Sequence, residues 1–142
     1  MSATELYQAA IKSLAQAATG HGRLDAPDGR ALLDNPLCGD RVTIDLVMDD
    51  SRVTALGHDV RGCLLCEAAA AIIAAHAAGS TADELKSASA SAASLLKGAD
   101  VEAIWPDLRM FLPVRAHKSR HRCVLLPFEA LEAALAKAGK GR

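Results

Sequence analysis

The stretch VTIDLVMDDSRVTALGHDVRGCLLCEAAAAIIAAHAAG, residues 42–79, decides which fold this chain adopts. In residues 42–48 apolar side chains alternate with other residue types, and this period of two indicates a half-buried β-strand. An Asp-Asp-Ser turn follows, so residues 53–60 are predicted to return as an antiparallel strand. Residues 62–78 are almost all helix formers and apolar on every side, which predicts a buried helix ended by a glycine.

A helix and a further strand are predicted on the N-terminal side of this stretch. Ser2 and Glu5 form a capping box at the start of a helix that ends by Gly20. Residues 31–33, Ala-Leu-Leu, are apolar and follow a segment rich in turn-forming residues. They suit an edge strand.

Three more helices are predicted on the C-terminal side. Ser80 and Asp83 suit the start of a helix that runs to about residue 97, and a short helix is predicted over residues 101–105. The last helix is expected to start near Leu126, because Pro127 is best tolerated in the first turn of a helix. This start would place Cys123 in the loop before the helix.

These elements predict one domain of the α+β class, residues 1–142, in which a small antiparallel sheet of about three strands packs on helices. A chain of 142 residues with 51% hydrophobic content suits one core. The longest apolar run, residues 68–75, is far shorter than the roughly 18 residues needed to span a bilayer. The N-terminus does not have the pattern of a signal peptide. We therefore expect a cytoplasmic protein without a membrane partner.

The overall charge argues against a nucleic-acid partner, since the net charge is −1 and aromatic residues make up 3% of the chain. Basic residues nevertheless gather just before Cys123: Arg115, Lys118, Arg120 and Arg122. This stretch is either an ordinary solvated surface, or a docking surface or electropositive setting for a nearby thiolate.

The four cysteines are better explained as ligands or nucleophiles than as disulfides, because the cytosol keeps thiols reduced. Cys38 and Asp40 precede the first strong strand, Cys63 stands at a helix start, and Cys123 precedes the last helix. Side chains at such junctions can converge from separate elements. Zinc accepts thiolate and carboxylate ligands, and iron–sulfur clusters are held mainly by thiolates. These four residues are therefore the predicted metal ligands.

Three further residues could assist the site. Cys66 lies one helical turn after Cys63, so it is either an extra ligand or a small buried apolar residue. His121 and Arg120 are auxiliary candidates because they closely precede Cys123, although an exposed loop histidine is the alternative interpretation of His121. His58 and His76 are expected to make local hydrogen bonds instead.

Three motifs resemble those of the iron–sulfur cluster assembly proteins of the IscU, SufU and NifU N-terminal type. They are Asn-Pro-Leu-Cys-Gly-Asp at 35–40, Gly-Cys at 62–63 and Arg-His-Arg-Cys-Val-Leu-Leu at 120–126. The resemblance extends from about residue 34 to residue 135. It is closest to the SufU branch, because Arg-x-x-Cys replaces the His-Cys of IscU and the interval between the second and third motifs is long.

The resemblance implies an α+β fold with a metal site at one end, held by Cys38, Asp40, Cys63 and Cys123. SufU-like proteins hold Zn²⁺ there and accept persulfide sulfur from a cysteine desulfurase on the cysteine matching Cys38. IscU-like proteins instead assemble a [2Fe–2S] cluster, and their acceptor matches Cys123. The expected partners are a cysteine desulfurase and a downstream cluster scaffold or apo-protein acceptors. The chain would act as a sulfur carrier or scaffold rather than as a stand-alone enzyme.

Three other functions share parts of this pattern. A zinc deaminase also orders an acidic motif before a Cys-x-x-Cys helix start, but here Asp40 is one methylene short and no proline precedes Cys63. A thioredoxin-like redox pair at Cys63 and Cys66 lacks the flanking βαβ pattern. A purely structural zinc site is the remaining alternative, and a chain this long and apolar hardly needs one.

Overall fold

The computed structural model describes residues 3–37, 39–99 and 104–140. Its elements in chain order are α1 (Ala3–Ala17), β1 (Gly29–Asn35), β2 (Asp40–Asp49), β3 (Arg52–Arg61), α2 (Leu64–Ala77), α3 (Ala82–Leu96), the 3₁₀ helix η1 (Pro106–Ala116) and α4 (Lys118–Lys140). The helix predicted at the N-terminus is confirmed as α1, while Ser2 of its expected capping box lies outside the described residues. Among the described helices, none is both long and apolar enough to span a membrane.

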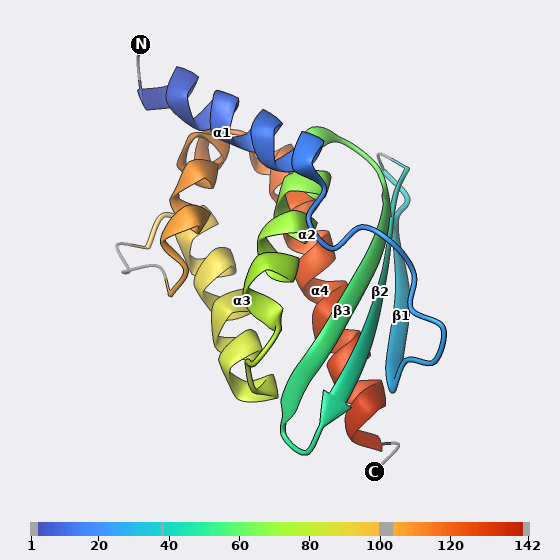
Figure 1. Ribbon diagram of the computed structural model, residues 1–142. Coiled ribbons are helices and arrows are strands. Elements are labelled where there is room, and N and C mark those ends of the chain that lie inside the picture. The colour runs from blue at the N-terminus through green and yellow to red at the C-terminus, as the bar shows by residue number, and fades with distance from the viewer. Residues whose placement is uncertain (1–2, 38, 100–103, 141–142) are drawn as a thin grey trace.

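β2 is the central strand of a three-stranded antiparallel sheet with the order β1-β2-β3. In this register Ile44 faces Ala31 of β1 and His58 of β3. Val42, Ile44 and Leu46 are fully buried on the face that α2 and α4 cover (Figure 1). The predicted α+β class, the hairpin and the edge strand are therefore confirmed.

The opposite face of β2 carries a buried charge at Asp45. Its carboxylate accepts hydrogen bonds from Arg23 Nε at 2.7 Å, from Arg30 Nε at 2.6 Å and from the Leu24 amide at 3.0 Å. Burial opposes the charge of Asp45, but these hydrogen bonds outweigh it and lower the pKa of the carboxyl group. Asp45 thus anchors the loop between α1 and β1 across this face of the sheet.

α2 is buried on most sides, as predicted, because alanine and isoleucine line almost its whole circumference. α3 begins slightly later than predicted, and its cap is Thr81 rather than Ser80. The Thr81 hydroxyl accepts from the Glu84 amide at 3.1 Å, and the Glu84 carboxylate accepts from the Thr81 amide at 3.1 Å. This reciprocal pair is a capping box, which stabilises the first turn of α3.

The prediction that the last helix starts near Leu126 is wrong. α4 begins at Lys118, so Cys123 lies within the helix and Pro127 lies in its interior. An internal proline costs a helix about 3 kcal/mol. Apolar burial offsets this cost, because Val124, Leu126 and neighbouring apolar side chains of α4 are completely buried.

The short helix predicted over residues 101–105 is not supported where it can be seen. Residues 100–103 lie outside the described part of the chain, and residues 104–105 form a bend. A 3₁₀ helix starts instead at Pro106. Proline suits this position because its fixed φ is compatible with a helical start and its missing N–H would have had no partner there.

Candidate metal centre

Three of the four predicted ligands converge at one end of the molecule. Asp40 is the first residue of β2, Cys63 directly precedes α2, and Cys123 lies in the second turn of α4. One ligand atom from each of the three lies within 4.8 Å of the others. In Figure 1 the starts of β2, α2 and α4 lie at the same end of the fold. Residues separated by up to 83 positions in the sequence thus form one donor cluster.

Asp40 is 4% exposed and is held against the backbone that leads into α2. Its Oδ1 accepts a hydrogen bond from the Cys63 amide at 3.3 Å, and its Oδ2 lies 4.0 Å from Cys63 Sγ. A Cβ atom on Gly62 would lie 2.6 Å from Asp40 Oδ1, closer than real Cβ contacts come. Gly62 therefore leaves the space that the carboxylate occupies beside Cys63.

Cys63 is the N-cap residue of α2 and has an extended backbone, with φ −77° and ψ 171°. Its side chain makes no capping hydrogen bond, so its sulfur is not committed to the helix amides. The positive end of the α2 dipole favours a negative charge at this position. Cys63 is only partly buried, which leaves it the more accessible of the two clustered thiols.

Cys123 is 7% exposed on α4. Burial raises the pKa of its thiol well above the usual range, and the neighbouring Cys63 and Asp40 raise it further. Three acidic donors packed this closely repel one another when all are charged. A cation between them would remove that repulsion, and metal binding would release the proton of the thiol.

The donor set fits a soft or borderline metal. Two thiolates and one carboxylate from Asp40, Cys63 and Cys123 are ligand types that zinc accepts, and thiolates also hold iron–sulfur clusters. Three protein ligands leave one position of a tetrahedral shell to be supplied by another group.

Pro127 affects the backbone at Cys123. In a regular helix the Cys123 carbonyl would accept from the amide of the residue four positions later, but Pro127 has no N–H. The helix therefore lacks that hydrogen bond in the turn that carries a clustered thiol. The sequence predicted that Pro127 marks the start of the helix. Its location inside the helix, one turn after a clustered thiol, became evident only in the structure.

Cys38 lies outside the described residues, so its role as fourth ligand stays a prediction. Its chain neighbours are described. Leu37 is 95% exposed, and Gly39 has a φ of +77°, which favours glycine. The Gly39 amide donates to the Asn35 carbonyl at 2.8 Å and closes the turn that leads into Asp40.

Cys66 and His121 are not among the three clustered donors of the described residues. Cys66 is fully buried in the hydrophobic core, and the donor cluster found among the described residues does not include it, so its role as an extra ligand stays a prediction. His121 lies in the first turn of α4 rather than in a loop, and its Nε2 is 3.1 Å from the carbonyl oxygens of Val114 and Arg115. In this arrangement His121 ties the end of η1 to α4.

His58 and His76 make local hydrogen bonds, as predicted. His58 Nε2 donates to the Thr19 carbonyl at 2.7 Å, and His76 Nε2 lies 3.1 Å from a carboxylate oxygen of Asp107. The His76 ring also stacks on Trp105 with 4.4 Å between ring centroids. These contacts join the turn after α1 to β3, and α2 to η1.

Comparisons with known proteins place the fold in context. Residues 6–138 match the family model described as NifU-like N terminal domain. The iron–sulfur cluster assembly scaffold protein IscU of Thermotoga maritima is 24% identical over 133 residues, which cover 93% of this chain and 94% of that protein.

Two solved structures have the same fold. One is the N-terminal part of a nitrogen-fixing NifU-like protein from Brucella abortus, with 34% identity, a TM-score of 0.88 and 96% of each chain covered. The other is a putative iron–sulfur cluster assembly scaffold protein for the SUF system from Fervidobacterium islandicum AW-1. It has 23% identity and a TM-score of 0.83, with 89% of this chain and 93% of that chain covered, and this likeness concerns the fold alone.

Proposed function

Because this chain belongs to the NifU-like N-terminal domain family, we propose that it serves iron–sulfur cluster assembly by holding a metal centre and accepting sulfur beside it. The observation that carries this proposal is the donor cluster of Asp40, Cys63 and Cys123, whose ligand atoms lie within 4.8 Å of one another. The similar Thermotoga maritima protein is named as a cluster assembly scaffold, which supports the same general role.

We propose Cys38 as the fourth ligand and Zn²⁺ as the resident metal. Cys38 stands two residues before Asp40, so the chain cannot carry it far from the cluster. A thiolate in the fourth position would complete a tetrahedral shell of three sulfurs and one oxygen. When bound, the metal keeps its thiolate ligands deprotonated at neutral pH.

We further propose that Cys38 accepts sulfur from a cysteine desulfurase. Its thiolate would attack the outer sulfur of the desulfurase persulfide, a new S–S bond would form on Cys38, and the desulfurase cysteine would leave as a thiolate. Cys38 is better suited than Cys123, because Leu37 beside it is 95% exposed whereas Cys123 is buried within a helix. The reaction needs reduced thiols, so we place it in the cytoplasm.

These features favour a SufU-like role within the family. Arg120-x-x-Cys123 replaces the His-Cys pair, and α3 and η1 lie in the long interval between Cys63 and Cys123. The second candidate function is assembly of a [2Fe–2S] cluster on the same ligands. The scaffold name of the Thermotoga maritima relative favours this alternative. In either role the sulfur or cluster would pass to a downstream scaffold or apo-protein.

Metal analysis and a visible spectrum of protein purified without air test the proposal. We expect about one zinc per chain and no colour, and Cys63→Ser and Cys123→Ser should lose most of that metal. Iron with sulfide absorption would support the cluster scaffold instead. Mass spectrometry after incubation with desulfurase and cysteine should then find added sulfur on the Cys38 peptide, whereas sulfur on Cys123 would favour the IscU-like route.

A further inference from the structure

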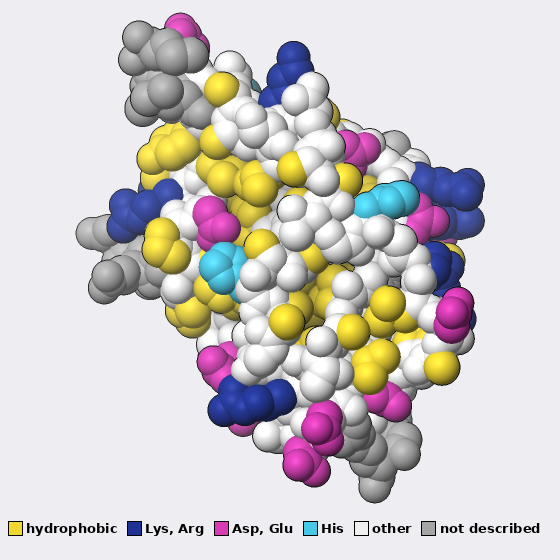
Figure 2. Space-filling view, in the orientation of Figure 1, with side chains coloured by type: hydrophobic (Ala, Val, Ile, Leu, Met, Phe, Trp, Pro, Cys, Tyr) yellow, Lys and Arg dark blue, Asp and Glu magenta, His cyan; other side chains and the backbone are white. Residues whose placement is uncertain are grey.

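A groove of about 840 Å³ opens beside the metal centre, and the chemistry proposed above does not use it. Its floor is apolar and is built from three helices: Ile11, Leu64, Leu65, Pro113 and Val114. Leu64 directly follows Cys63 in the chain, yet it is 50% exposed. Figure 2 shows hydrophobic side chains at the surface beneath α1, where α1 approaches η1 and α2.

The rim of the groove is basic. Lys12 of α1 and Arg120 of α4 line it, and no carboxylate of the described residues does. In residues 3–37, 39–99 and 104–140, the side chains of Lys12 and Arg120 make neither a hydrogen bond nor an ion pair. By contrast, Arg122 pairs with Glu129 at 3.0 Å, and Arg115 donates to carbonyls at the end of α3. The rim therefore offers free positive charges beside an apolar floor.

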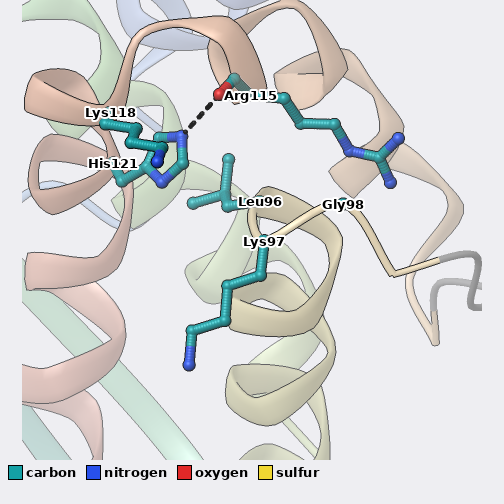
Figure 3. A pocket seen from close by; sticks show the side chains of 6 residues that line it. All are labelled: Leu96, Lys97, Gly98, Arg115, Lys118 and His121. Atoms are coloured by element: carbon teal, nitrogen blue, oxygen red, sulfur yellow. Dashed lines mark hydrogen bonds between the residues drawn. The ribbon is translucent and has the colours of Figure 1, made fainter.

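A second basic hollow lies on the other side of the first turn of α4. Its volume is about 480 Å³, and its polar lining comes from Lys97, the C-cap residue of α3, together with Arg115, Lys118 and His121. Figure 3 shows Lys97 and Lys118 reaching this hollow from different helices, while the Arg115 guanidinium points away. Among the described residues, which leave out residues 100–103, no acidic side chain lines it. Residues 117–121 thus form a basic ridge between the groove and the hollow.

We propose that the groove and the basic ridge bind an acidic, apolar segment of the protein that delivers sulfur to the metal centre. Apolar side chains of this segment fill the groove, and its carboxylates meet Lys12, Lys118 and Arg120. The charge is local, because the whole chain carries a net charge of −1. The groove is concave and is lined by Leu64, the residue after Cys63, so a protein segment fits it better than a flat lipid surface. This inference rests on the proposed function.

Charge reversal at Lys12 and Lys118 tests the electrostatic contribution to binding of the partner segment. With a cysteine desulfurase from the same organism, Lys12→Glu/Lys118→Glu should raise the half-saturating desulfurase concentration about tenfold in 0.05 M salt. The final amount of persulfide should stay that of the wild type. In 0.5 M salt the difference should shrink to about threefold or less, since salt screens exposed charges. Lys86→Glu/Lys137→Glu is the matched control, because both lysines are exposed on surfaces away from the groove, and it should change little.

Removal of one apolar anchor tests the groove itself. Leu64→Gln should raise the half-saturating concentration about fivefold at both salt concentrations. Leu32→Gln is the control, because Leu32 is 49% exposed on β1, away from the groove. Zinc content and circular dichroism of each variant check that the centre and the fold are retained.

The outcomes separate this inference from the proposed function. If the wild-type chain receives no sulfur from the desulfurase, the proposed function fails and the docking surface fails with it. If the wild type is sulfurated and the groove and ridge variants behave like their controls, only the docking surface is refuted. A last outcome concerns lipid. If the wild type binds anionic phospholipid vesicles more strongly than the Lys12→Glu/Lys118→Glu variant does, but the two proteins respond equally to desulfurase, the surface binds lipid and the docking proposal is refuted.

Discussion

Gly62 should strengthen metal binding although its side chain cannot ligate a metal. A Cβ atom at this position would lie 2.6 Å from Asp40 Oδ1, whereas ordinary van der Waals contact begins at 3.4 Å. In Gly62→Ala the carboxylate must therefore retreat by about 0.8 Å. A retreat of that size takes Oδ1, now 3.3 Å from the Cys63 amide, beyond hydrogen-bonding distance at about 4 Å.

The energetic consequence follows from the bond that is lost. A hydrogen bond to a charged group contributes about 1.5–3 kcal/mol. Since about 1.4 kcal/mol is tenfold in affinity, Gly62→Ala should weaken zinc binding by about 10- to 100-fold. Competition with a chromophoric zinc chelator measures this change directly.

A matched substitution separates the site from the general effect of replacing glycine. Gly139 lies in α4 with no atom within 4 Å of an added Cβ, so Gly139→Ala should leave zinc affinity unchanged and stabilise α4 slightly. Urea unfolding of the zinc-free proteins shows whether Gly62→Ala alters the fold itself. Zinc affinity within about twofold of the wild type for Gly62→Ala would refute the inference that this glycine holds Asp40 in place.

Three further predictions concern the core and the buried charges. Cys66→Ala should keep full zinc occupancy by metal analysis and cost about 1 kcal/mol of unfolding free energy, because Cys66 packs in the core; loss of zinc would make it a ligand. Asp45→Asn should lower the unfolding free energy by about 2 kcal/mol. Because the pKa of Asp45 is lowered in the fold, its contribution is present above the unfolded pKa and is lost as pH falls through the folded value. The variant should therefore lose less stability in acid than the wild type, and equal acid profiles in urea titrations would contradict this. Burial lowers the pKa of His58 below 6.5, so stability should decline as pH falls from 7 to 5, and His58→Gln should reduce that decline.

Local patterns in the sequence were enough to predict most of the fold. The alternation in residues 42–48 and the turn after it predict β2 and β3 because strand periodicity is a short-range property. The all-apolar run after Gly62 likewise predicts a buried helix. The family was also recognisable from three short motifs, which the match over residues 6–138 confirms. These features depend on residue type and spacing, which the sequence gives directly.

The start of α4 could not be predicted in the same way. Pro127 is unfavourable inside a helix, so the local sequence predicted that the helix starts near Leu126. The helix nevertheless continues through Pro127, because the burial of Val124, Leu126 and other apolar side chains in the core offsets the lost hydrogen bond. That gain depends on elements far away in the sequence. The position of Cys123 inside a helix is therefore a result of tertiary packing.

The sequence by itself determined the donor types of the site, the α+β fold and the family, because these follow from residue identity, local periodicity and motif order. Only the tertiary structure decided which donors meet. It brings Asp40, Cys63 and Cys123 together and leaves Cys66 in the core, although Cys66 is three residues from Cys63. The physical reason is the direction in which each side chain leaves the backbone. Cys63 caps α2 with an extended backbone, whereas Cys66 lies inside the helix and is buried in the core.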